Sequence, residues 1–202
     1  MIIDYNVNYN NYSKNILNNN KFFNYECPKC GNKHSWNRHG SYNRNLTIVE
    51  NNSFIDTIII ILRLKCTSCN STHAILPSDI IPYHIYSLSS TIKILLEHYE
   101  ENLSVLSIAK KYNISFQLIY FILNIYISFI NEYIYTLRIL NVIKGTFIPT
   151  AKKLLSLITN QINYYLDYSK INKWPFFMTK FRNKHSISIF IEFNYLKIYQ
   201  PT

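Results

Sequence analysis

Four cysteines are the residues of this chain with the clearest chemical meaning. They form two C-x-x-C pairs with 35 residues between them: Cys27 and Cys30, then Cys66 and Cys69. A C-x-x-C turn points two thiolates at one spot, so two such turns can complete a tetrahedral cage of four sulfurs. The two-pair pattern predicts one structural Zn²⁺ ion. A rubredoxin-like iron site, a redox-active dithiol and free thiols are the alternatives.

Three histidines lie near these cysteines in the sequence, at His34, His39 and His73. Because four cysteines already complete a cage, we expect the histidines to lie at the surface or to form hydrogen bonds. Met1–Asn24 lacks the basic start and apolar stretch of a signal peptide. Paired cysteines without such a signal favour a metal site in a reducing cytoplasm over disulfides.

Carboxylates are too sparse for metal-dependent hydrolysis. After Glu132 the chain has only Asp167 and Glu192, which are too few for a metal-binding carboxylate trio. The acidic cluster at residues 97–101 ends a predicted helix and is expected to be a solvated face. The sequence also has no glycine-rich phosphate loop and no nucleophile–base pattern. We therefore expect a protein that is not an enzyme.

The chain is basic, with a formal charge of +10, and residues 146–202 hold eight Lys or Arg against two acidic residues. Such a surplus suits an anionic partner, either nucleic acid or an acidic membrane surface. Residues 112–131 carry no formal charge and have the length of a membrane span. Four amides interrupt that stretch, and amides are costly to bury in hydrocarbon, so we expect no membrane span.

The composition is rich in asparagine, which occurs 26 times. We attribute this bias to AU-rich codons. Residues 1–24 share it, have no stable periodicity, and are expected to be a flexible arm. Residues 41–49 and 54–65 are predicted to be two strands joined by a turn at 50–53, and the short β-branched run at 58–62 favours a strand over a helix. Residues 72–86 contain two prolines and are expected to be an extended connector.

Helices are predicted after this connector. The first begins at Ser89 or Ser90 and the second covers residues 103–112. The third has no breaker from about residue 116 to 140 and is expected to run long. The remaining predicted elements are an amphipathic helix over 150–168 and an alternating strand over 186–195.

Residues 105–122 have the pattern of a helix-turn-helix. Ala109 is the small residue where two helices would touch, Asn113 tolerates the positive φ of the turn, and Ser115 is placed to cap the second helix. Apolar residues occupy the remaining offsets: Ile108, Tyr112, Ile114, Ile119 and Ile122. An ordinary helical hairpin in a protein core is the alternative interpretation.

The outward positions of the second helix would carry amide, hydroxyl and aromatic groups but no Lys or Arg. Amides can pair with adenine, and aromatic rings can meet thymine methyl groups. Phosphate contacts would come from cations outside that helix, for which Arg63 and Lys65 are additional candidates. The predicted DNA-binding residues are Arg38, Arg44, Lys110, Lys111, Ser115, Gln117, Tyr120 and Asn124.

Four motifs precede the helix-turn-helix: Cys27-Pro-x-Cys30-Gly31, His39-Gly40-x-Tyr42-x-Arg44, Arg63-x-Lys65-Cys66-x-x-Cys69 and Thr72-His73-Ala74-Ile75-Leu76-Pro77. In this order, followed by the helix-turn-helix, they resemble the N-terminal module of bacterial insertion-sequence transposases, and more closely a group of transposase-like zinc-ribbon proteins of clostridia and relatives. The resemblance covers about residues 25–130. It implies binding to the terminal repeats of a mobile element, with cutting done by a separate Mg²⁺-dependent RNase H-like domain.

We therefore expect an α+β chain with a small four-cysteine zinc-ribbon β module, an all-helical helix-turn-helix domain and a short C-terminal α/β extension. The expected boundaries are 1–24 for the arm, 25–86 for the ribbon and connector, 87–145 for the helical domain and 146–202 for the basic extension. The expected role is binding of double-stranded DNA in the cytoplasm, at the nucleoid.

Three other roles are left open by the sequence. One is a protein-interaction module in which the long helix over 116–140 forms a homodimer. Another is an inactive transposase remnant. The last is a subunit that works with a separate transposase catalytic subunit.

Overall fold

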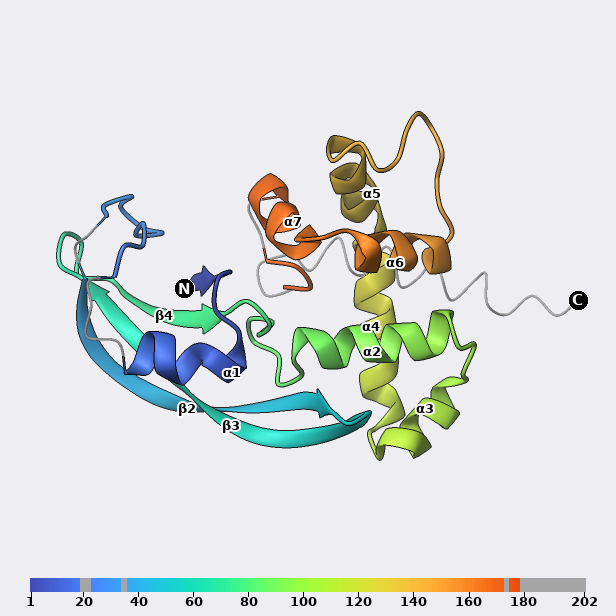
Figure 1. Ribbon diagram of the computed structural model, residues 1–202, viewed down its shortest axis with the longest axis horizontal. Helices are drawn as coiled ribbons and strands as arrows, with labels where there is room; N and C mark the ends of the chain where they lie inside the picture. Colours follow the sequence, from blue (N-terminus) through green and yellow to red (C-terminus); the bar gives the residue numbers. More distant parts are fainter. Residues whose placement is uncertain (19–22, 34–35, 173–174, 179–202) are drawn as a thin grey trace, which may run out of the picture. The chain divides into compact units, whose positions relative to one another are not determined.

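The structure, a computed structural model, describes residues 1–18, 23–33, 36–172 and 175–178. The chain divides into two compact units, Met1–Ile92 and Lys93–Thr202. The first unit holds a four-stranded sheet, and the second is helical over its described residues (Figure 1). This confirms the mixed α+β class predicted from the sequence.

The sheet of the first unit is built on a long hairpin. Its antiparallel strands are β2 (Trp36–Glu50) and β3 (Ser53–Cys66). Asn51 and Asn52 connect them with φ angles of 49° and 61°, and two left-handed residues are what a two-residue turn needs to match the twist of its strands. The two predicted strands and their turn are present, and both strands are longer than predicted.

Two shorter strands complete the sheet in the order β1-β4-β3-β2. β4 (Thr72–Pro77) runs antiparallel to β3, and β1 (Ile2–Asp4) runs parallel to β4. The predicted connector over 72–86 is therefore wrong in its first part. Residues 72–77 form a strand in which 72–74 pair with β3 and 75–77 pair with β1.

The N-terminal segment belongs to the core of this unit. It forms α1 (Tyr9–Tyr12) and a π-helical turn, η1 (Ser13–Leu17), and α1 lies on the concave side of the hairpin (Figure 1). Tyr12 is fully buried, and its hydroxyl donates to the Ile75 carbonyl at 2.7 Å and accepts from the Leu62 amide at 3.0 Å. The predicted flexible arm over 1–24 is thus wrong for its described residues. Their apolar side chains join the core: Val7, Tyr12 and Ile16.

The second unit is an assembly of helices. α2 (Leu88–Tyr99) spans the boundary between the units. It is capped two or three residues earlier than predicted, because the Ser87 hydroxyl accepts the amide of Ser90 at 3.1 Å. The helices that follow are α3 (Val105–Tyr112), α4 (Phe116–Ser128), α5 (Ile130–Ile139), α6 (Ala151–Asn160) and α7 (Tyr164–Asn172).

The long helix predicted over 116–140 is two helices, α4 and α5, bent by 47° at a break around Phe129. No single helix among the described residues is long and apolar enough to span a membrane. α4 and α5 meet the length and composition criteria only when they are taken together as a bent pair. The helix predicted over 150–168 is likewise divided into α6 and α7, and Ile162 in the break is 81% exposed. The strand predicted over 186–195 lies outside the described residues.

Aromatic residues form much of the core of the second unit. The rings of Tyr133 and Phe176 are 4.9 Å apart, and those of Tyr126 and Tyr133 are 5.7 Å apart. The Tyr126 hydroxyl also donates to the Ala151 carbonyl at 2.7 Å, which ties α4 to the start of α6. Such packing buries one face of α4 and leaves the opposite face exposed.

Left-handed backbone in the described chain is carried mainly by asparagine. Nine non-glycine residues have positive φ, and seven of these are Asn. Asn tolerates this conformation better than most residues because its short amide can hydrogen-bond locally. The seven are Asn51, Asn52, Asn70, Asn102, Asn113, Asn141 and Asn163.

Candidate metal centre and helical surface

Each C-x-x-C pair lies on a tight turn, and the two turns have the same hydrogen bonds. In the first, the Gly31 amide donates to the Cys27 carbonyl at 2.8 Å; in the second, the Asn70 amide donates to the Cys66 carbonyl at 2.9 Å. Gly31 and Asn70 both have left-handed backbone, with φ of 73° and 59°. The turns are therefore structural repeats, one at the end of β3 and the other before β2.

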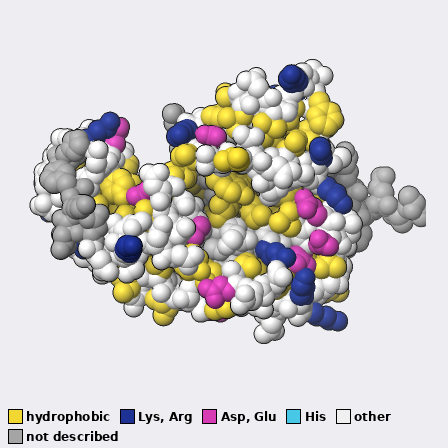
Figure 2. Space-filling view, in the orientation of Figure 1, with side chains coloured by type: hydrophobic (Ala, Val, Ile, Leu, Met, Phe, Trp, Pro, Cys, Tyr) yellow, Lys and Arg dark blue, Asp and Glu magenta, His cyan; other side chains and the backbone are white. Residues whose placement is uncertain are grey.

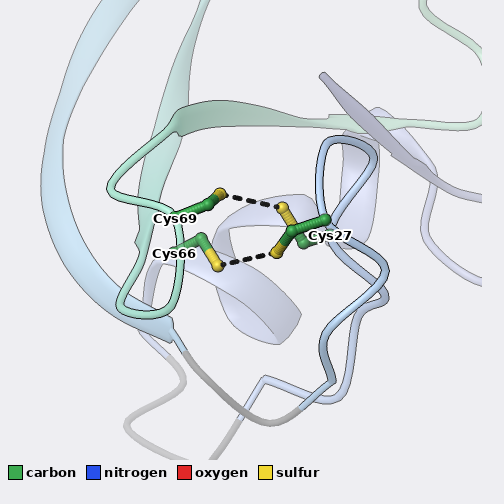
Figure 3. A group of neighbouring side chains, drawn as sticks. Cys27, Cys66 and Cys69 are labelled. Atoms are coloured by element: carbon green, nitrogen blue, oxygen red, sulfur yellow. Dashed lines mark hydrogen bonds between the residues drawn. The ribbon is translucent and has the colours of Figure 1, made fainter.

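The four sulfurs converge on one point. The Sγ atoms of Cys27 and Cys69 are 3.7 Å apart, as are those of Cys30 and Cys66, and all four lie within 4.8 Å of one another (Figure 3). A tetrahedral ion with metal–sulfur bonds of about 2.3 Å would place its sulfurs about 3.8 Å apart. The cluster is thus a candidate metal site whose donor type and spacing fit a single ion.

The surroundings of the cluster shift the pKa values of its thiols in opposite directions. Burial alone would raise the pKa of Cys27, but the amides of Lys29 and Cys30 and the hydroxyl of Ser71 lower it to about 5. The Asn32 amide acts to lower the pKa of Cys30, yet desolvation and the neighbouring thiols raise it to about 12. Four thiols at this distance repel one another once ionised, and a divalent cation among them would offset that repulsion.

A polar group lies behind one side of the cluster. The Ser71 hydroxyl is 2.8 Å from the Cys69 Sγ and 2.9 Å from the His73 Nε2, and that nitrogen is 3.6 Å from the Cys27 Sγ. His73 is buried in β4, with Trp36 edge-on to its ring at 5.7 Å. His39 is exposed, and His34 lies outside the described residues. Sequence reasoning did not identify Ser71; its position two residues after Cys69 was the available signal.

The two predicted DNA-binding arginines hydrogen-bond to backbone carbonyls within the first unit. Arg38 donates to the carbonyls of Leu17 at 2.9 Å and Ile16 at 3.1 Å, which holds η1 against the hairpin. Arg44 donates to the carbonyls of Ile81 at 2.8 Å and His84 at 2.7 Å. Burial lowers the pKa of Arg44. Both guanidinium groups thus fix the fold around β2.

The two predicted lysines at the end of α3 differ from each other. Lys111 lies 2.7 Å from the Glu97 carboxylate, which also pairs with Lys93 at 3.2 Å and accepts the Tyr112 hydroxyl at 2.6 Å. Glu97 is only 2% exposed, so the predicted solvated acidic face is wrong for this residue. Lys110 is exposed and makes no ion pair with any residue the structure describes.

α3 and α4 are joined by a short turn with a serine cap at the start of each helix. The Ser104 hydroxyl accepts the Ser107 amide at 3.1 Å, and the Ser115 hydroxyl accepts the Leu118 amide at 3.3 Å. Asn113 ends α3 in the left-handed region, with φ of 53° and ψ of 45°. The Ser115 cap and the turn at Asn113 therefore have the conformations expected from the sequence pattern, and the Ser104 cap is an addition to it. The buried apolar residues of the pattern are Ile108, Tyr112, Ile119 and Ile122.

The outer face of α4 presents uncharged polar and aromatic side chains to solvent. Phe116, Tyr120 and Phe121 are 47%, 53% and 47% exposed. Ser115, Gln117 and Asn124 are exposed beside them, so the predicted contact residues of this helix share one accessible surface. Among the described residues, Lys and Arg side chains on the face shown in Figure 2 are scattered, with Asp and Glu among them.

Comparison with known proteins gives one similarity. Residues 27–110 match a protein family described as "Domain of unknown function (DUF6431)". The matched region contains all four cysteines, β2 to β4, α2 and most of α3, and it ends before α4. No curated protein and no solved structure matches the chain.

Proposed function

We propose that this chain is a zinc-stabilised protein that binds double-stranded DNA with sequence preference, as the DNA-recognition part of a transposase does. The observation that carries this proposal is the pair α3–α4, with its left-handed turn at Asn113 and the accessible, uncharged face of α4. In a helix-turn-helix the first helix crosses the DNA backbone and the second enters the major groove. α3 and α4 would take these two roles.

The exposed side chains of α4 favour A·T base pairs. Gln117 and Asn124 are seven residues apart, with Tyr120 and Phe121 between them, so the four lie along one stripe of the helix. An amide can form two hydrogen bonds with adenine, and an aromatic ring can contact the thymine methyl group. We therefore propose that this stripe makes the base contacts.

The metal in this proposal is zinc in a structural role. Four cysteine sulfurs occupy all four positions of a tetrahedral ion and leave none for substrate or water, which is typical of structural zinc sites. Soft thiolate ligands also bind iron, and zinc is preferred because the paired turns and tetrahedral spacing are its commonest setting. The ion would join the start of β2 to the end of β3.

Fewer residues are proposed to contact phosphate than the sequence alone suggested. Arg38 and Arg44 donate to backbone carbonyls of their own unit, and Lys111 pairs with Glu97, so these three are not among the proposed phosphate contacts. Lys110 remains on the helical surface, and Arg63 is exposed on β3. Direct readout by α4 would then contribute a larger share of affinity than in a strongly basic reader.

The test of DNA binding is selection of duplexes from a random pool by the zinc-loaded full chain, followed by fluorescence anisotropy on the enriched sequence. Replacing Gln117 and Tyr120 by Ala should weaken binding by about tenfold or more, since a good base contact contributes about 1–3 kcal/mol. The matched control replaces Asn131 and Tyr135, an exposed amide and tyrosine on α5, and should bind normally. No enrichment and no binding at low salt would overturn the proposal.

The zinc assignment has its own test. Metal analysis of the purified chain should give one zinc per protein, and Cys27→Ser or Cys66→Ser should remove it. Thr67→Ala, an exposed change within the second turn, is the control that should retain zinc. Purified protein containing neither zinc nor iron would contradict the site.

A homodimer is the second candidate, and the observation that favours it is the exposure of three aromatic rings on α4. Such rings are frequent in the centres of protein interfaces. Phe116→Ser with Phe121→Ser should convert a dimer to a monomer in sedimentation analysis if α4 forms the interface. If the mass is unchanged while DNA binding is lost, the DNA-reading role is favoured.

A further inference from the structure

The four cysteines of the candidate metal site have different surroundings. Cys27 and Cys66 are 1% and 0% exposed, Cys69 is half-buried, and Cys30 is exposed. Solvent therefore reaches the cluster from one side, where Cys30 lies. An ion held by four equivalent bonds would still have one ligand that is far easier to approach than the others.

The opposite side of the cluster has a second layer of polar groups. With Cys69 as a thiolate, the Ser71 hydroxyl at 2.8 Å must donate to its Sγ, and it then accepts from the Nε2–H of His73 at 2.9 Å. The same His73 nitrogen lies 3.6 Å from the Cys27 Sγ. One serine and one histidine thus contact a sulfur from each of the two turns.

We propose that the metal cage is braced on the Ser71–His73 side and opens at Cys30. Ser71 and His73 are positioning residues that hold Cys27 and Cys69 in place, and Cys30 is the first sulfur to leave the metal and the first to react with an electrophile. This inference rests on the zinc site proposed above. Beyond that site, it identifies Ser71 and His73 as the residues that help to retain the ion and Cys30 as the position at which the site is modified.

Physical chemistry supports both halves of the proposal. Hydrogen bonds to a ligand fix its orientation, and losing such outer partners typically lowers metal affinity about 10–100-fold. Reactivity toward electrophiles requires a thiolate that is accessible to the reagent. Metal binding keeps all four sulfurs as thiolates, so accessibility decides among them, and Cys30 is the most accessible.

The chemistry of modification is simple for a maleimide reagent. The Cys30 Sγ would form a bond to one alkene carbon of N-ethylmaleimide with its lone pair. The alkene π electrons would take up a proton from water at the other carbon. The product would be a thioether, which is a much poorer metal ligand than a thiolate, so Cys27, Cys66 and Cys69 would remain as the thiolates able to hold an ion.

The first experiment locates the reactive cysteine. Zinc-loaded full chain is treated with N-ethylmaleimide below one equivalent, and singly modified protein is mapped by mass spectrometry. We expect Cys30 to carry most of the label, with Cys69 second and Cys27 and Cys66 last. Label that appears first on Cys27 or Cys66 would overturn the open side at Cys30.

The second experiment tests the brace by the rate of zinc transfer to a chromogenic chelator. Ser71→Ala and His73→Phe should each release zinc about 10–100-fold faster than the unmodified chain. His73→Gln keeps a hydrogen-bond donor and should recover part of the loss, and Thr67→Ala serves as the control. Equal release rates in all variants would overturn the brace.

Failure of the zinc site and failure of the brace at Ser71 and His73 give different experimental results. A protein that binds no metal contradicts the zinc site itself. A zinc-loaded protein that labels elsewhere, or that keeps its zinc without Ser71 and His73, contradicts only this inference. The N-ethylmaleimide experiment can be repeated on protein loaded with Co²⁺ in place of zinc. Charge-transfer absorption by Co²⁺–thiolate bonds then reports how many sulfurs remain bound after modification.

Discussion

Glu97 shows how a single residue can have a different role from the one its sequence context predicts. It stands beside two other acidic residues at the end of α2, which is typical of a solvated face. In the structure it is buried and accepts hydrogen bonds from Lys111 and Tyr112 of α3. Burial alone would raise the pKa of Glu97, but these bonds and the one from Lys93 lower it below its ordinary value.

Glu97→Ala is expected to destabilise the chain by about 2–3 kcal/mol, because a buried charge-assisted hydrogen-bond network is lost. Urea unfolding monitored by circular dichroism measures the change. Glu100→Ala, in the same acidic cluster but exposed, is the matched control and should have little effect. Equal stabilities of the two variants would contradict the role assigned to Glu97.

The pH dependence of this contribution follows from the direction of the shift. Because the folded-state pKa of Glu97 lies below the ordinary value of 4.5, its stabilisation is complete above about pH 4.5 and is lost as the pH falls through the lower folded pKa. The difference in unfolding free energy between the unmodified chain and Glu97→Ala should therefore shrink in acid. A difference that stays constant down to pH 3 would argue against this linkage.

Lys110 and Lys111 are neighbours in the sequence, but their substitutions are expected to have different effects on DNA binding. Lys110 is free to contact phosphate, whereas the charge of Lys111 is paired with Glu97. Lys110→Ala should reduce the slope of log affinity against log salt by about 0.9, the value for one phosphate contact. Lys111→Ala should leave the slope unchanged and lower stability instead. Anisotropy titrations at several salt concentrations measure both slopes. A reduced slope for Lys111→Ala and an unchanged slope for Lys110→Ala would contradict the assignment of Lys110 to a phosphate contact.

At the scale of elements, the turn between α3 and α4 depends on one conformation. Asn113 has a left-handed backbone that a β-branched residue adopts only at a cost. Asn113→Val should therefore lower stability by about 1–2 kcal/mol and weaken DNA binding, while Asn113→Gly should preserve both. Thermal unfolding and anisotropy measure the two effects. A fully stable Asn113→Val protein would mean that the turn tolerates another geometry.

Local signals were sufficient to predict the elements that frame both candidate sites. The β-branched run in β3, the Asn51–Asn52 turn and the serine cap of α4 each act within a few residues. The two C-x-x-C turns are equally local. For these reasons the hairpin, the approach of the four cysteines and the exposed face of α4 could be anticipated from the sequence.

Elements that depend on distant partners could not be predicted in the same way. β1 and β4 are short, and they pair with each other across about seventy residues of chain. Tyr12 is buried because β3 and β4 both hydrogen-bond to its hydroxyl, which no local pattern indicates. The bend at Phe129 occurs without proline or glycine, at a buried residue whose ring stacks on that of Tyr133. The hydrogen bonds of Arg38 and Arg44 to the carbonyls of Leu17 and Ile81 are likewise between residues far apart in the sequence, so no local pattern indicates them.

At the scale of the whole molecule, the division into two units has a consequence for metal removal. All four cysteines lie in Met1–Ile92, and α3 to α7 lie in Lys93–Thr202. Chelation of zinc should therefore increase amide hydrogen exchange in β2, β3 and β4 far more than in α4 and α5. Hydrogen-exchange mass spectrometry with and without chelator measures this. Equal loss of protection in both units would show that they unfold together.

Asparagine occupies left-handed backbone positions in this chain where glycine is usual, and this use follows the codon bias of its gene. Every glycine codon begins with two guanines, whereas asparagine codons begin with two adenines, and the chain has 3 Gly against 26 Asn. Helix ends and tight turns that would ordinarily select glycine here use asparagine, as at Asn70 and Asn113. A gene under pressure toward adenine and thymine can thus retain its turns. The same positions also place amides beside serine, as in Asn52-Ser53 and Asn70-Ser71, where slow deamidation would age the folded protein.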